Sequence, residues 1–127
     1  MSSEERVMAM GKLKTFVACQ KSLECVDFVV RDISVMEPSA DTSCLRSQQI
    51  GSVDSICEDL EAGSGRWDQN EYAQFLIIAN GSTVETMGRY KRMRRWFPEP
   101  VVEHRVQLCN EIIKILTTTV VKLKWQR

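Results

Sequence analysis

The sequence predicts an all-α protein, an up-down-up-down antiparallel four-helix bundle. Apolar residues recur at three- and four-residue steps through nearly all of the 127 residues, which is the period of an α-helix. Proline or glycine interrupts that pattern at three places and leaves four segments of similar length. Helices joined by connections this short pack as antiparallel neighbours. We therefore expect a single domain over residues 1–127, long enough to bury its own core.

The first helix is expected from about Glu4 to Met36, because Pro38 lacks an amide hydrogen and restricts the residue before it. Large apolar residues form one broad stripe along it, and this stripe is the predicted buried face. Its members are Leu13, Phe16, Val17, Gln20, Leu23, Val26, Val30 and Ile33.

The second helix is expected to begin at a cap formed by Asp41 or Ser43 and to end at about Ala62. Gly63 follows, where a left-handed C-cap favours glycine, and Gly65 and Arg66 complete the predicted turn. The inner face of this helix is predicted to comprise Leu45, Gln48, Gln49, Ser52, Ile56 and Leu60.

The third helix is expected from Gln69 to about Trp96, with Asp68 as its N-cap and Pro98 beyond its end. Gly81 and Ser82 lie inside it, although glycine costs about 1 kcal/mol relative to alanine in a helix interior. Close approach of a neighbouring helix is the favoured explanation, and a functional bend or partner contact is the alternative.

The fourth helix is expected to open at Glu99-Pro100, since proline is tolerated in a first turn. Residues 117–121 are β-branched and favour a strand, but the apolar heptad continues on both sides and predicts helix, with fraying near Thr119 as the alternative. That heptad is Val102, Val106, Cys109, Ile113, Leu116, Val120 and Leu123. A second apolar stripe beside it exceeds what one bundle seam needs and predicts a subunit interface at Val101, Leu108, Ile112 and Ile115.

Composition favours a cytoplasmic protein. Five cysteines are an odd number with no C-x-x-C spacing, as expected for buried free thiols in a reducing compartment rather than for disulfides or zinc. No apolar run approaches the ~20 residues of a membrane span, so no membrane association is expected. The N-terminal residues lack the pattern of a signal peptide.

Charge is unevenly distributed although the net charge is zero. Residues 37–88 hold nine acidic residues against Arg46 and Arg66, and residues 89–127 hold ten basic residues against three acidic ones. Such opposed halves can neutralise each other within or between subunits, or present a local anion-binding face.

A run of cations at the end of the third helix is the main functional candidate. Tyr90, Met93 and Phe97 are expected on the inner face, so the cations project elsewhere. Three roles remain open: complementing the helix dipole in solvent, binding RNA or DNA phosphates, and pairing with the acidic second helix of a neighbouring subunit. The run comprises Arg89, Lys91, Arg92, Arg94 and Arg95.

Catalytic chemistry is not expected. The glycines around Ser64 follow a helix, whereas a phosphate-binding loop follows a strand. A di-iron bundle needs Glu-x-x-His on two helices, and His104 is the only histidine. We therefore expect no catalytic residue, no metal and no cofactor, and expect His104 on the surface.

The region from Leu45 to Glu85 resembles one small bacterial family. The resemblance rests on an ordered set: Leu45-x-x-Gln48, Ser55-Ile56, Gly63-x-Gly65-Arg66 and Glu71-Tyr72-x-x-Phe75-Leu76-x-x-Ala79-x-Gly81-Ser82-x-x-Glu85. This set is similar to the four-helix-bundle proteins encoded within intervening sequences of bacterial 23S ribosomal RNA genes. The chain departs from that pattern at residues 59–63, where Ala62 stands at the usual glutamate and Glu61 lies one position earlier.

The resemblance implies a cytosolic homo-oligomer, a ring of five bundles, without an established biochemical activity. A related branch comprises the accessory proteins of diversity-generating retroelements, which bind a reverse transcriptase and nucleic acid through a basic surface. The expected function is therefore a non-enzymatic adaptor for nucleic acid or protein. The alternative is a structural scaffold in which the basic run forms intersubunit ion pairs.

Overall fold

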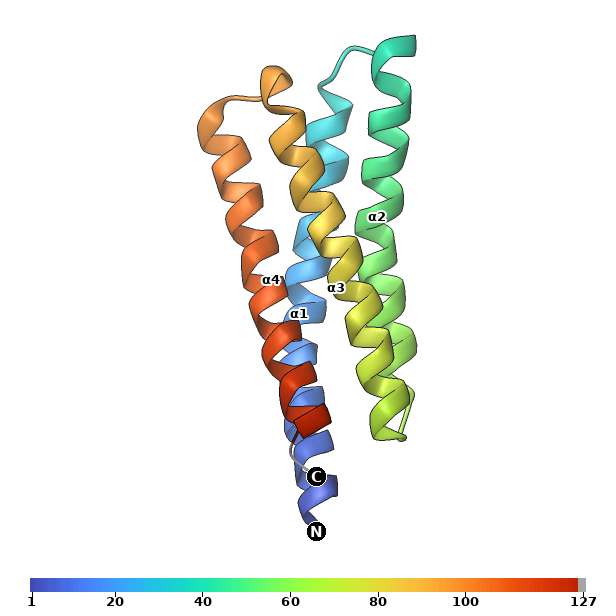
Figure 1. Ribbon diagram of the computed structural model, residues 1–127. Coiled ribbons are helices and arrows are strands. Elements are labelled where there is room, and N and C mark those ends of the chain that lie inside the picture. Colours follow the sequence, from blue (N-terminus) through green and yellow to red (C-terminus); the bar gives the residue numbers. More distant parts are fainter. Residues whose placement is uncertain (126–127) are drawn as a thin grey trace.

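The computed structural model describes residues 1–125 and consists of four long helices. They are α1 (Ser3–Ser34), α2 (Ala40–Ser64), α3 (Gln69–Arg92) and α4 (Glu99–Trp125), with one 3₁₀ turn, η1 (Arg94–Trp96), between the last two. Consecutive helices run in opposite directions (Figure 1). The α1–α2 and α3–α4 connections lie at one end, called the upper end here, and the α2–α3 turn lies at the lower end with the N-terminus. The predicted four-helix architecture is confirmed.

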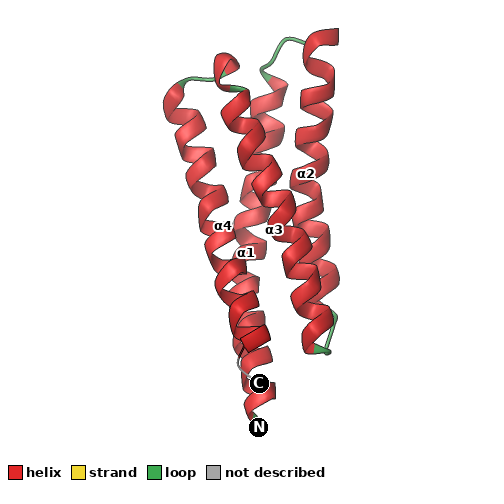
Figure 2. Cartoon of the chain, in the orientation of Figure 1, coloured by secondary structure: helices red, strands yellow, loops and turns green. Residues whose placement is uncertain are grey.

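Short connections leave nearly all of the described chain helical (Figure 2). Asp68 caps α3 as predicted, accepting a hydrogen bond from the Glu71 amide at 3.0 Å. The cap of α2 is Ser39, so the prediction of Asp41 or Ser43 was wrong. Ser39 follows Pro38 in an extended conformation, and its hydroxyl accepts from the Thr42 amide at 3.3 Å. Helix α3 ends at Arg92, four residues earlier than predicted.

All four helices contribute to one principal core. Each packs mainly on its neighbours in chain order, and α4 closes against α1. Tyr90, Met93 and Phe97 are buried as predicted. Fully buried members of the principal core include Ala18, Val29, Ile56, Leu60, Tyr72, Leu76, Cys109, Ile112 and Leu116.

The predicted inner face of α1 was wrong for most of its members, although Val26 and Ile33 do pack against the core. Leu13, Phe16, Leu23 and Val30 are 70%, 61%, 55% and 50% exposed, and Val17 is also exposed. The core side consists largely of small residues, which let α1 approach α4 and α2 closely: Gly11, Thr15, Ala18, Ser22, Cys25 and Val29. The Ser22 hydroxyl donates to the Ala18 carbonyl at 2.7 Å, so its burial leaves that donor satisfied.

The buried register of α4 is also shifted from the predicted heptad. Leu108 and Ile112, predicted at a subunit interface, lie in the core, while Val101 and Ile115 are partly buried against it. Ile113 is only partly buried although the heptad placed it inside. Leu108 and Ile112 therefore leave little apolar surface for another subunit to cover.

The β-branched segment of α4 is helical, as the heptad predicted. The hydroxyls of Thr118 and Thr119 donate to the carbonyls of Lys114 and Ile115, each at 2.7 Å. These bonds to the preceding turn satisfy the hydroxyls without leaving the helix. Helix α4 continues to Trp125.

Gly63 does not form the predicted left-handed cap. It lies within α2, and among residues 1–125 neither a glycine nor any other residue has a positive φ. A Cβ at Gly63 would lie 2.9 Å from the Cβ of Phe75 on α3. The position favours glycine because α3 approaches the end of α2 closely. Gly65 caps α2 in a right-handed conformation, with φ −84°.

No other helix within residues 1–125 approaches Gly81 closely. A Cβ there would meet nothing within 4 Å, so close approach of a neighbouring helix in the same chain does not explain this glycine. Ser82 beside it is half-buried, and its carbonyl accepts from the Thr86 hydroxyl at 2.9 Å.

Candidate nucleic-acid interface

Four cations of the predicted run are exposed together at the upper end. Lys91 and Arg92 lie in the last turn of α3, and Arg94 and Arg95 lie in η1. This group is called the basic end. Positive charge is favourable here because the carbonyls of the last turn of α3 carry partial negative charge.

Arg89, the fifth predicted cation, is not part of the basic end. It is 8% exposed, and its Nη1 donates to Gln49 Oε1 at 2.8 Å and to Ser52 Oγ at 3.0 Å. Burial lowers the pKa of this guanidinium, and the nearby charge of Arg92 lowers it further. Arg89 therefore joins α3 to α2 and is unavailable to a phosphate.

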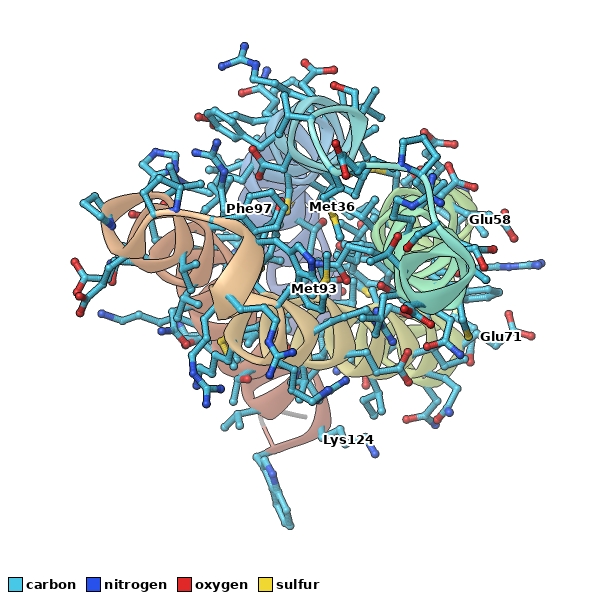
Figure 3. All side chains as sticks on the ribbon, turned by 90° about the horizontal axis from the view of Figure 1, so that it is seen from above. Met36, Glu58, Glu71, Met93, Phe97 and Lys124 are labelled. Carbon is cyan, nitrogen blue, oxygen red and sulfur yellow. The ribbon has the colours of Figure 1, made fainter. Side chains whose placement is uncertain are left out.

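A small apolar cluster supports the basic end from below. Met36, Met93 and Phe97 come from the end of α1, the residue after α3 and the α3–α4 connection, and they are 5%, 0% and 7% exposed. Seen from above, these three side chains lie between the helices (Figure 3). Because Met93 and Phe97 flank η1, their packing fixes the short segment that carries Arg94 and Arg95.

A buried ionic network braces the same end. The Asp32 carboxylate of α1 accepts from Arg105 Nε at 2.8 Å, from Arg105 Nη2 at 2.9 Å and from the Tyr90 hydroxyl at 2.7 Å. It thus joins α1, α3 and α4. Hydrogen bonding to Asp32 raises the pKa of Arg105, and burial raises the pKa of Tyr90.

His104 lies on the surface beside this network. Its Nδ1 is 2.8 Å from Arg105 Nη1, and its ring meets Phe28 edge-on at 4.9 Å between centroids. The ring is therefore held against α1 from the exposed side, as a support for Arg105.

The four cations of the basic end have no carboxylate partner within residues 1–125. The ion pairs in that part of the chain are Lys21 with Glu111 and Arg105 with Asp32. Arg95 lies 5.6 Å from the ring centroid of Trp96, and Arg94 donates only to the Lys91 carbonyl, at 3.4 Å. Their charge is available to an anion.

A groove of about 590 Å³ separates part of the basic end from the start of α4. Lys91 and Arg94 line it together with Glu99 and Glu103, above Val102 and Val106. A phosphate in this groove would meet two carboxylates as well as two cations. Arg92 and Arg95 are not among the lining residues, so they are the better anchors for a phosphate backbone.

Sequence reasoning missed two further arginines at this end. Arg31 is exposed in the last turn of α1, and Arg46 near the start of α2 donates from Nε to Thr42 Oγ1 at 3.3 Å. They are distant from the basic run in sequence. The antiparallel arrangement could have indicated them, because it brings the end of α1 and the start of α2 to the end of α3.

The remaining predicted turn residue, Arg66, lies at the opposite, lower end. Its guanidinium is 5.1 Å from the ring of Phe75, where it stabilises the α2–α3 turn. Residues 1–125 contain no cluster of three histidine, cysteine, aspartate or glutamate side chains arranged to hold a metal.

All five cysteines are free thiols within the described chain, and only Cys44 is exposed. In the core, interaction with the Cys109 thiol raises the pKa of Cys25, and burial raises the pKa of Cys57 to about 11. Raised pKa values make these thiols unreactive. No helix in residues 1–125 is long and apolar enough to cross a membrane.

The family of this chain follows from comparison of its whole amino-acid sequence with known proteins, not from the basic end. No curated protein and no solved structure was found to match it. The sequence model of one protein family, described as 23S rRNA-intervening sequence protein, matches residues 14–118. This span includes most of α1, all of α2 and α3, and most of α4. The chain therefore belongs to the 23S rRNA-intervening sequence protein family.

Proposed function

We propose that this protein is a non-enzymatic, cytoplasmic, homo-oligomeric adaptor that binds RNA or DNA through its basic end. The observation that carries the proposal is the presence of four exposed cations without carboxylate partners on a braced surface. Arginine and lysine in such an array neutralise backbone phosphates without reading sequence. The proposed binding is therefore electrostatic and tolerant of sequence.

The Leu45–Glu85 region resembles the intervening-sequence proteins, and that resemblance implies a related branch, the accessory proteins of diversity-generating retroelements, which supports the same proposal. Those proteins bind a reverse transcriptase and nucleic acid through a basic surface. An adaptor of this kind needs a rigid scaffold and a charged end rather than a catalytic pocket. The braced upper end of the bundle meets that requirement.

A salt-dependent titration tests the proposal. Labelled RNA and DNA oligonucleotides are titrated with the protein by fluorescence anisotropy at 50 and 200 mM salt. We expect binding at low salt that weakens steeply at high salt, because bound counterions are released from the phosphates. Replacing Arg92 and Arg95 with Gln should weaken binding at least tenfold and reduce the salt slope by about 2.

A double variant on α4, away from the basic end, provides the matched control. Lys114 and Lys124 are exposed cations of α4, and their replacement with Gln removes the same charge away from the basic end. We expect that control to bind like the parent protein. Absence of binding at 50 mM salt, or equal losses in both double variants, would contradict the proposal.

A structural scaffold is the second candidate. Its support is the acidic outer surface of α2, where Asp54, Glu58 and Glu61 are exposed and have no ion pair within residues 1–125. In this alternative the basic end pairs with α2 of a neighbouring subunit. Replacing Arg94 and Arg95 with Glu distinguishes the two by mass in solution. Dissociation supports the scaffold, whereas an intact oligomer that no longer binds nucleic acid supports the adaptor.

A further inference from the structure

The outer face of α1 is apolar along much of its length, and no other element of residues 1–125 covers it. Leu13, Phe16, Leu23 and Val30 follow one another at three- and seven-residue steps, and each is at least half exposed. This is the seam spacing of helices that pair side by side. Large side chains in such a row indicate an interaction surface rather than a solvated face.

The outer face of α3 is also apolar, but glycines without side chains interrupt it. Ile77, Ile78 and Val84 are exposed there, and Gly81 lies among them. A Cβ at Gly81 would meet nothing within 4 Å, and one at Gly88 would meet only the side chain of Arg92 on the same helix. Gly81 thus leaves an open gap on this face, and Gly88, one heptad later, leaves a second gap that the flexible end of the Arg92 side chain partly covers.

The exposed apolar side chains of α1 and the glycines of α3 lie at matching heights along the bundle. Buried hydrogen bonds join Thr15 to Tyr72 and Asp32 to Tyr90, at sequence separations of 57 and 58. Helices α1 and α3 run in the same direction (Figure 1). A residue of α1 is therefore level with the residue of α3 about 58 positions later. Leu23 is level with Gly81, and Val30 is level with Gly88.

We propose that α1 of one copy packs in parallel against α3 of a second copy, with Leu23 and Val30 inserted beside Gly81 and Gly88. The two halves of this match occur on one chain, which identifies the partner as another copy of this protein. A rotation about an axis parallel to the bundle keeps every copy at the same height and so preserves the match. The inference deepens the self-association included in the proposed function and is independent of nucleic-acid binding.

Two carboxylates meet at this contact, and one arginine lies near both. In the level register, Asp27 of α1 faces Glu85 of α3, and Arg31 lies one helical turn above both, about 6 Å along the axis. The Arg31 guanidinium can therefore reach both carboxylates. Arg31 also lies 5.5 Å from the ring of Phe28, which holds it on this face.

The contact joins two different faces, α1 of one copy and α3 of the next, and is therefore heterologous. Each helix packs mainly on its chain neighbours, so α1 and α3 occupy opposite corners of the bundle. Each copy thus offers α1 to one neighbour and α3 to another. Such head-to-tail contacts build rings or open chains, whereas a self-complementary patch stops at a dimer. The expected assembly is larger than a dimer.

Replacing Gly81 with Leu tests the contact without threatening the fold. The open space around Gly81 accommodates a side chain in the single chain, and leucine is the better helix former. In the assembly that leucine fills the gap needed by Leu23. We expect light scattering to report loss of the oligomer, with unchanged helical circular dichroism and an unfolding temperature no lower than that of a parent sample dissociated by dilution.

Gly51 provides a matched control, because it is an exposed glycine within α2 whose added Cβ also meets nothing within 4 Å. The Gly51→Leu variant should keep the parent mass. A second variant, Leu23→Glu, damages only the α1 face and should also dissociate. Mixing it with Gly81→Leu joins one intact α1 face to one intact α3 face, so a one-to-one heterodimer is expected.

Several outcomes would overturn the proposal. A parent protein that is monomeric at 50 μM, or that stops at a dimer, lacks the heterologous contact. Dissociation by Leu23→Glu but not by Gly81→Leu means that α1 pairs with a surface other than α3. Failure of nucleic-acid binding leaves these masses unchanged, so the assembly and the adaptor function fail separately.

Discussion

Asp32 shows how one buried carboxylate positions the whole upper end. Its two oxygens accept three hydrogen bonds from Arg105 and Tyr90, so its charge is both paired and hydrogen-bonded. Removing one partner leaves the others buried and short of bonds, which costs more than the net contribution of the pair. The network therefore specifies how α1, α3 and α4 meet beneath the basic end.

Tyr90 gives this network a pH dependence. Burial raises its pKa above the value of about 10 that an unfolded tyrosine has, so the stability it contributes is present below pH 10 and is lost as pH rises further. In Tyr90→Phe, the free energy of unfolding at pH 8 should fall by about 1–2 kcal/mol with the lost hydrogen bond. Between pH 10 and 11 the variant should lose less stability than the parent protein, by up to ~1 kcal/mol.

Urea unfolding at pH 8, 10 and 11 measures this difference. The pKa of Tyr72 is also raised by burial. The Tyr72→Phe variant therefore serves as a comparison that keeps the alkaline loss of stability due to Tyr90. Buried thiols such as Cys57 add to the alkaline loss in every variant and cancel in the comparison. Equal alkaline slopes for Tyr90→Phe and the parent protein would show that Tyr90 does not control this step.

At the scale of the helix, the sequence predicts where each helix begins and ends better than it predicts which face of the helix is buried. Pro38, Gly65 and Pro98 mark the breaks because each affects the backbone locally, whatever surrounds it. The buried face of α1 is different. Its outward leucines and its inward alanine and serine both repeat with helical spacing, and periodicity alone favours the larger residues. Which stripe is buried depends on how closely α4 approaches, and that is a property of the packed bundle.

The candidate site was likewise predictable only in part. The exposed positions of Lys91, Arg92, Arg94 and Arg95 follow from the local pattern around Tyr90 and Met93, which the core requires. Arg89 could not be separated from them by position on α3. Its burial depends on Gln49 and Ser52, polar residues of α2 that supply the acceptors for its guanidinium. The sequence of α3 does not contain that information.

The junction of α2 and α3 depends on the absence of a side chain at Gly63. Replacing Gly63 with Ala would place a Cβ 2.9 Å from the Cβ of Phe75, which cannot rotate away because it is attached to the α3 backbone. We expect the free energy of unfolding to fall by about 1–3 kcal/mol, as for other overpacked cores. Gly51→Ala should instead raise it by about 0.5–1 kcal/mol, because alanine is the better helix former and the site is open.

Urea denaturation of both alanine variants compares two glycines of the same helix that differ in their surroundings. Equal shifts in the two variants would contradict the close approach of Phe75. The sequence suggested a turn at Gly63, and the turn does follow it. The reason for glycine is steric contact between helices, which the local pattern around residues 59–63 does not express.

At the scale of the whole molecule, the parallel contact between α1 and α3 relates the two proposals. Copies that pack side by side at one height point the same way, so their upper ends lie on the same side of the assembly. The basic ends then form one extended cationic surface. A long RNA can contact several of them at once, whereas a short oligonucleotide can contact only one.

The monomeric Gly81→Leu variant should therefore lose affinity for long RNA but not for short RNA. After the first contact, each further basic end binds at a high effective concentration, which can raise overall affinity by about 10²–10⁴-fold. We expect the variant to bind a six-nucleotide RNA like the parent protein and to bind a 60-nucleotide RNA at least tenfold more weakly. Anisotropy titrations at 50 mM salt, with Gly51→Leu as control, measure both. Equal affinity of parent and variant for the long RNA would place the basic ends on different sides of the assembly, since copies in parallel cannot separate them.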